Sequence, residues 1–118
     1  MAHAKHPKPE AQLEQVLGEA SWLLSHAEAL ADYGRAEEAA AELARAASCA
    51  EQAAYWLDAA GREQEAATQR VSAASCYESL GQPARAMTLL RAALLTELPE
   101  DYRNRLRQQL SHCLSQAA

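Results

Sequence analysis

The stretch VSAASCYESLGQPARAMTLLRAALLTELPED, residues 71–101, decides the fold of this chain. Its order predicts a helix, a turn at Gly81, a second and more apolar helix, and a stop at Pro99. Pro83 falls in the first turn of the second helix, where a missing N–H is tolerated. The segments upstream repeat this pattern less regularly, so we expect helix–turn–helix units throughout.

Composition indicates an all-α fold. Of the 118 residues, 49% are apolar, mostly alanine and leucine, which lead the helix-propensity scale. The β-branched residues that favour strands are scarce, with no Ile and only two Val. We expect a single helical domain at residues 10–118, large enough to bury a core without disulfides. Residues 1–9 contain two Pro, two Lys and two His, which predicts a disordered tail.

Apolar residues recur at i, i+3, i+4 and i+7 along most of the chain, which is the signature of amphipathic helices. Because the predicted links are only one to three residues long, neighbouring helices must run antiparallel. We expect the fourth helix to be central, because its apolar residues, through Leu95, cover most of its circumference. The five predicted helices span residues 10–33, 35–60, 62–80, 83–97 and 100 to the C-terminal end.

Charge and cysteine content narrow the function classes. The formal net charge of −5 does not suit binding to nucleic acid, which needs a basic surface. No apolar run approaches the length of a membrane span, and the N-terminus lacks a signal-peptide core. Three cysteines, an odd number, favour reduced thiols in a cytoplasm. The excess of alanine and of arginine over lysine is typical of a GC-rich bacterial genome.

Motifs for catalysis or cofactor binding are absent from the sequence. It has no glycine-rich phosphate loop, no Gly-x-Ser-x-Gly and no Cys-x-x-Cys, so we expect no enzyme activity, catalytic residue or cofactor. A metal-binding or thiol-redox bundle stays open as a weaker alternative. Its candidate ligands are Cys49, Cys76, His26 and His112, with His3 and His6 in the tail as adventitious metal ligands.

Three aromatic residues lie off the apolar stripes of the first two helices. Trp22 and Tyr33 lie opposite the first stripe, with His26 to one side, and Trp56 lies off the second stripe. A large apolar side chain on the outer face of a helix needs a second layer, from this chain or from a partner. These residues therefore predict a protein-binding surface or, alternatively, the interface of a homodimer.

An internal repeat links the second and third predicted helices. Residues 34–51 and 61–78 match at a constant offset of 27 residues. The matched positions include a glycine at the start of each segment, and Cys49 and Cys76 near its end. Shared glycine and cysteine positions favour a repeated unit over chance similarity between alanine-rich helices.

The spacing in residues 20–99 resembles that of the tetratricopeptide (TPR) repeat family. The family pattern has a small residue and an aromatic in the first helix, then a turn glycine, two spaced alanines and a closing proline. The positions that match it are Ala74, Tyr77, Gly81, Ala86, Ala93 and Pro99, and Gly34 with Ala39 and Ala46, and Gly61 with Ala66, repeat its turn half. The chain departs from the family in period, in having Arg70 at the usual tryptophan position, and in its long second helix.

The resemblance implies a TPR-like helix–turn–helix stack, or a fragment of a right-handed α-solenoid. It also implies a concave surface, lined by the first helix of each unit, that accepts a peptide or a helix of another protein. The groove positions that match the family carry no basic residue, so the resemblance does not imply a carboxylate tail as ligand. These positions are Thr68, Val71, Ser75, Glu78 and Ser79.

We therefore expect an adaptor or chaperone that binds an apolar or basic segment of a partner protein. The alternative is a self-associating bundle in which the same aromatic residues close a homodimer. The predicted partner-binding residues are Trp22, His26, Tyr33, Trp56, Val71, Ser75 and Glu78.

Overall fold

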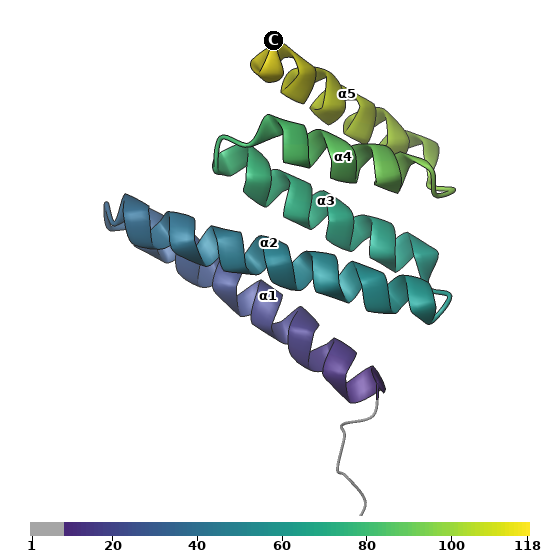
Figure 1. The fold of residues 1–118 in the computed structure, drawn as a ribbon, viewed down its shortest axis with the longest axis horizontal. Coiled ribbons are helices and arrows are strands. Elements are labelled where there is room, and N and C mark those ends of the chain that lie inside the picture. Colours follow the sequence, from purple (N-terminus) through teal and green to yellow (C-terminus); the bar gives the residue numbers. More distant parts are fainter. Residues whose placement is uncertain (1–8) are drawn as a thin grey trace, which may run out of the picture.

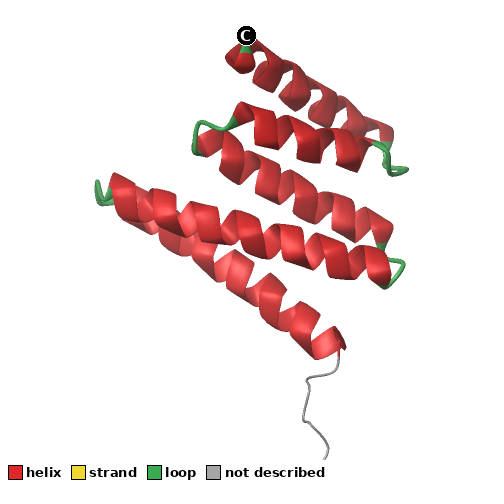
Figure 2. Ribbon diagram, viewed as in Figure 1, coloured by secondary structure: helices red, strands yellow, loops and turns green. Residues whose placement is uncertain are grey.

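The computed structural model of the chain describes residues 9–118 and consists of five α-helices, with no strand among these residues (Figures 1 and 2). The all-α prediction is confirmed. The helices are α1 (Pro9–Asp32), α2 (Ala36–Ala59), α3 (Glu63–Ser79), α4 (Pro83–Leu94) and α5 (Glu100–Ala117). Pro9 already belongs to α1, and the rest of the predicted tail, including His3 and His6, lies outside the described residues.

The helices stack in chain order, and each packs mainly against its neighbours in the sequence (Figure 1). The middle of the stack is therefore α3, and the prediction that the fourth helix is central was wrong. The apolar surface of α4 is shared between α3 and α5, and its buried residues are Ala86, Leu90 and Ala93. None of the helices in the described part of the chain combines the length and the apolar content of a membrane span.

The end of α4 also differs from the prediction. The helix stops at Leu94 instead of continuing to Glu97, and the Leu95 side chain, which we expected in the core, is 90% exposed. After Leu94 the α-helical pattern ends, because the N–H groups of Leu95 and Thr96 donate to the carbonyls three residues back, those of Ala92 and Ala93. The resulting link is longer than predicted, and Arg103 closes it by donating a 2.9 Å hydrogen bond to the carbonyl of Thr96.

The first three links have the same geometry. Gly34, Gly61 and Gly81 adopt φ values of +76°, +76° and +73°, the left-handed conformation that a side chain disfavours. In each link the glycine N–H donates to the carbonyl three residues back, and the next N–H donates to the carbonyl five residues back. This is the Schellman motif, which satisfies the last carbonyls of a helix. The 27-residue offset of the internal repeat therefore equals the 24 residues of α2 plus the three residues of the link that follows it.

Alanines form most of the interfaces between the helices. Ala47, Ala53, Ala67 and Ala73 are completely buried in α2 and α3. Such small side chains let helix axes approach to the short end of the usual range, about 8–10 Å. Each alanine buries little area, so the core depends on many contacts and on a few larger side chains. The largest fully buried side chains are Leu23, Leu57, Leu90, Leu106 and Cys113.

Candidate partner-binding groove

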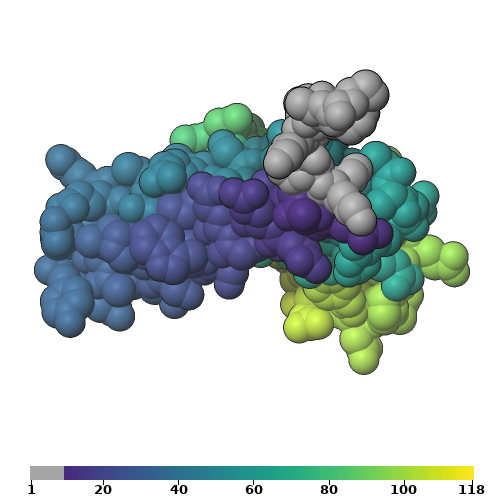
Figure 3. All heavy atoms as spheres, turned by 90° about the horizontal axis from the view of Figure 1, so that it is seen from below, coloured from purple at the N-terminus to yellow at the C-terminus, as the bar shows by residue number. Residues whose placement is uncertain are grey.

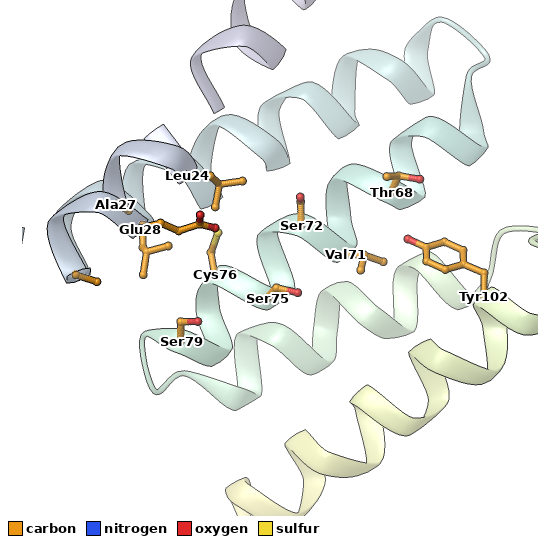
Figure 4. A pocket seen from close by; sticks show the side chains of 12 residues that line it. Leu24, Ala27, Glu28, Thr68, Val71, Ser72, Ser75, Cys76, Ser79 and Tyr102 are labelled. Atoms are coloured by element: carbon orange, nitrogen blue, oxygen red, sulfur yellow. The ribbon is translucent and has the colours of Figure 1, made fainter. Parts of the chain in front are cut away.

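A groove with a volume of about 590 Å³ runs along α3 and is lined by alternate helices of the stack (Figure 4). Residues of α1 line one end of the groove, Tyr102 of α5 lines the other end, and α3 lies between them. Leu43 is the one residue of α2 in the lining. The full lining is Leu24, Ala27, Glu28, Ala31, Leu43, Thr68, Val71, Ser72, Ser75, Cys76, Ser79 and Tyr102. We call this feature the α3 groove.

The α3 wall of the groove carries a row of hydroxyl groups beside apolar side chains. Thr68, Ser72, Ser75 and Ser79 follow one another at spacings of four, three and four residues, which keeps them on one face of the helix. Figure 4 shows these side chains along one side of α3, with Val71 pointing toward the ring of Tyr102. At 1.5 Å per residue the row is about 16 Å long, so the groove suits an elongated ligand.

The α3 groove is poor in charge. Glu28 is the only ionisable side chain in the lining apart from Cys76 and Tyr102, and no Lys or Arg contributes. A smaller cavity of about 200 Å³ continues the groove between α1, α2 and α3, and shares Leu24, Ser72 and Cys76 with it. The lining therefore offers an apolar surface with hydroxyl groups along one edge and a single carboxylate.

Two of the predicted partner-binding residues, Val71 and Ser75, lie in the α3 groove. Glu78, which we expected there, instead joins α3 to α5: it accepts a 2.6 Å hydrogen bond from Gln109 and a 3.2 Å contact from the Cys113 thiol. Glu78 is one turn of helix from Ser75 and faces α5, so its carboxylate is used within the fold. Glu78 is therefore not among the residues that line the groove.

Trp22, His26 and Tyr33 lie on the outer side of α1, away from the groove. Trp22 and His26 are each two residues from Leu24, which lines the groove. Two residues correspond to a rotation of about 200°, so both side chains leave the helix on nearly the opposite side from Leu24. Trp22 is 59% exposed and Tyr33 is 84% exposed. The predicted set of residues therefore forms two separate surfaces, one in the groove and one outside it.

Trp56 belongs to neither surface. It is half-buried and packs against a small core cluster that holds the start of α1 to the end of α2 and includes Leu13 and Leu57. The exposed aromatic residue of α2 is its neighbour Tyr55, at 70% exposure, which the sequence analysis missed. The helix period could not distinguish the two, because both lie off the stripe and only the position of α1 decides which one is covered.

Sequence reasoning also missed the α1 and α5 sides of the groove. Leu24 and Ala31 fall on the apolar stripe of α1, yet Leu24 is half-buried and Ala31 is exposed. The sequence feature that could have indicated this surface is the width of the apolar stripe, because a helix that packs on a single neighbour needs a narrower stripe. Tyr102 likewise falls on the apolar stripe of α5, and it is half-buried at the end of the groove.

The three cysteines are free thiols, and their surroundings favour the protonated form. Burial raises the pKa of Cys49 and of Cys76, and burial together with the contact to Glu78 raises the pKa of Cys113 to about 11. Nucleophilic attack and metal binding both need the thiolate, so these positions are poorly suited to either. Among residues 9–118 no three metal-ligating side chains come together.

Geometry thus defines an all-α stack with an open groove along its middle helix. Comparison with protein-family models, with curated proteins and with solved structures found no match to this chain.

Proposed function

We propose that this protein is a TPR-like interaction module, an adaptor or chaperone, that binds a segment of a partner protein in the α3 groove. The observation that carries the proposal is the alternation of the helices around the groove. The first helix of each hairpin, α1 and α3, together with α5, supplies eleven of its twelve lining residues. A TPR-like stack would present its first helices on the binding side in this way.

The lining favours an apolar partner segment that carries a basic side chain. Leu24, Val71 and Tyr102 offer apolar contacts, and Glu28 is the one charged group that a partner could pair with. A row about 16 Å long accommodates roughly three turns of a helix. An acidic segment would place its carboxylates beside Glu28 with no cation in the lining to offset them.

We place the module in the cytoplasm. The three cysteines are unpaired in the structure and lie on three different helices, α2, α3 and α5. Free thiols persist in a reducing compartment, whereas secreted proteins of this size more often pair their cysteines.

The test starts from peptides selected for binding to the wild-type protein from a displayed random library. We expect Val71→Asp to weaken the selected peptides by about tenfold or more, because it places an unpaired carboxylate against their apolar face. Thr88→Asp is the matched control, since it makes a similar change on an exposed position of α4 outside the groove. Fluorescence anisotropy of labelled peptides measures both affinities, and circular dichroism confirms that each variant is folded.

The proposal fails if the selected peptides bind Val71→Asp and the wild-type protein equally well. It also fails if the selection returns mainly acidic peptides, because their preference would contradict the charge of the lining.

A further inference from the structure

The outer side of α1 carries a row of exposed residues at the spacing of a helix-packing seam. Gly18, Trp22, Ser25, Ala29 and Tyr33 are separated by four, three, four and four residues, and all five are exposed. We call this row the outer stripe. Alternating steps of four and three residues are the spacing by which one helix packs along another in a coiled coil, and the first three steps of the row follow it. Figure 3 shows the later turns of α1 at the surface, with no other helix in front of them.

Trp22 is held in position although most of it is exposed. Its ring stacks on His26, with 4.7 Å between the ring centroids and 23° between the ring planes. His26 in turn contacts Glu42 of α2, whose Oε1 lies 3.2 Å from Nδ1 without forming a hydrogen bond. An exposed tryptophan that is already ordered loses little conformational entropy on binding, which is typical of an anchor residue.

Small residues beside Trp22 leave room for a partner backbone. Gly18 and Ser25 lie on either side of Trp22 along the stripe, and Ala29 precedes Tyr33. A Cβ atom added to Gly18 would meet nothing within 4 Å. Helices that meet through small residues can approach closely, while a neighbouring large side chain fills the adjacent hole. The stripe therefore suits an α-helix better than an extended strand.

Charge around the outer stripe favours a basic partner. The α1 sequence, Pro9–Asp32, contains five acidic residues and no Lys or Arg. At about 100° per residue, Glu14 and Asp32 flank the stripe on the side nearer the groove. Glu19 flanks it on the other side and has one cation near it, Arg45, at 3.6 Å. Basic residues along the edges of a partner helix would meet carboxylates on both sides.

A second copy of this chain is a poor occupant of the outer stripe. In a two-fold dimer of antiparallel α1 helices, each flank of the helix faces the same flank of its copy. The flank that carries Glu14 and Asp32 would then face the same acidic flank of the copy, and α1 has no Lys or Arg to separate the carboxylates. Like charges on the two facing flanks oppose self-association and favour a different, basic protein.

We propose that the outer stripe is a second docking surface, which binds a basic amphipathic helix of a partner protein with Trp22 as its anchor. It lies on the opposite side of α1 from the α3 groove, so the two surfaces can be occupied together. The inference does not depend on the groove, because none of the five stripe residues lines it.

The test uses a single-tryptophan protein, Trp56→Phe, in which Trp22 is the remaining indole. The probe is a synthetic helical peptide with leucine at its seam positions and lysine along both edges, and the matched peptide carries glutamate at those edges. We expect the lysine peptide to shift the emission of Trp22 and to bind roughly tenfold or more tightly than the glutamate peptide. Raising the salt concentration from about 0.05 to about 0.5 M should weaken binding, since salt screens exposed charges.

Two variants locate the binding site of the lysine peptide. Trp22→Ala, measured by anisotropy of the labelled peptide, should weaken binding by roughly 30-fold, as expected for loss of a tryptophan anchor. Val71→Asp, in the α3 groove, should leave the affinity unchanged. Trp22 is exposed, so its removal should leave the fold intact, and circular dichroism checks this.

Three results would overturn the inference. In the first, the lysine peptide does not bind, or binds Trp22→Ala as tightly as the parent protein. In the second, Val71→Asp abolishes binding, which would place the peptide in the groove. In the third, sedimentation shows a dimer that Trp22→Ala dissociates and that salt strengthens, which would make a second copy the occupant.

Discussion

The two helical hairpins of this protein, α1–α2 and α3–α4, share a turn geometry but differ in almost everything else. The first hairpin has two helices of 24 residues, whereas the helices of the second have 17 and 12. Residues 9–59 contain ten acidic and two basic residues, whereas residues 63–94 contain three of each. The α1–α2 turn projects past the ends of the other helices, and residues 31–38 are all exposed (Figure 1).

The aromatic residues follow the same division. In the first hairpin and its turn, Trp22, Tyr33 and Tyr55 are all more than half exposed. In the second, Tyr77 is 4% exposed, donates a 2.6 Å hydrogen bond to Glu51 and lies beneath the guanidinium of Arg85. The aromatic residue of the second hairpin thus belongs to the packed interior of the stack, whereas these three of the first hairpin and its turn face solvent. Matched substitutions in the two kinds of environment should therefore have different effects.

Removing a large side chain from the second hairpin should have the largest effect on stability. Leu90 of α4 is completely buried, so Leu90→Ala should lower the free energy of unfolding by about 2–5 kcal/mol. Urea denaturation followed by circular dichroism measures the change. Leu95→Ala, the same substitution at a 90% exposed position, is the control and should change it by no more than about 0.5 kcal/mol. Equal effects at the two positions would show that α4 does not pack as described.

Enlarging a buried alanine of α3 should have the next largest effect. Ala67 is completely buried against neighbouring helices, so Ala67→Leu should destabilise the protein by about 1–3 kcal/mol through overpacking. The matched change Ala44→Leu falls on an exposed position of α2 and should be close to neutral. A neutral Ala67→Leu would contradict the close approach of the helices.

Sequence patterns predicted the helices and turns well because both depend on local chemistry. Apolar periodicity located all five helices, and three of the four glycines mark the left-handed positions of the three short links. Leu95 was misplaced because apolar content alone does not show where a helix ends. There, the hydrogen bonds of Leu95 and Thr96 change to carbonyls three residues back, and the chain leaves the helix before the proline.

The candidate site was harder to predict because it depends on which helix lies opposite each side chain. Periodicity correctly assigned Trp22 and Tyr33 to an outer surface. It could not show that α1 covers Trp56, or that Gln109 of α5 donates a hydrogen bond to Glu78. The α3 groove is assembled from helices far apart in the chain, so only the resemblance to a repeat family indicated Val71 and Ser75.

Stability should fall at high pH because of Tyr77 in the second hairpin. Burial and the hydrogen bond to Glu51 raise the pKa of Tyr77 from 10.0 to about 12. The folded protein therefore holds the phenol proton more tightly than the unfolded chain, which stabilises the fold fully below pH 10. This stabilisation is lost as the pH rises from 10 to about 12.

The measurement is thermal unfolding of the wild-type protein and of Tyr77→Phe across that pH range. Cys113, whose pKa is raised from 9.0 to about 11, adds a loss of the same sign that begins at lower pH and occurs in both proteins. Tyr77→Phe should therefore lose less stability between pH 10 and 12 than the wild-type protein. If the two curves run parallel, Tyr77 does not hold its proton as described.

Alanine substitution at two glycines should have the smallest effects, and the effects should have opposite signs. Gly61 joins the two hairpins with a φ of +76°, so Gly61→Ala should destabilise the protein by about 1 kcal/mol because L residues resist that conformation. Gly18 lies within α1 in open space, so Gly18→Ala should stabilise it by roughly 0.5–1 kcal/mol through helix propensity. Urea denaturation measures both. If Gly18→Ala were destabilising, another element would have to cover this face of α1, and the outer stripe would not be free for a partner.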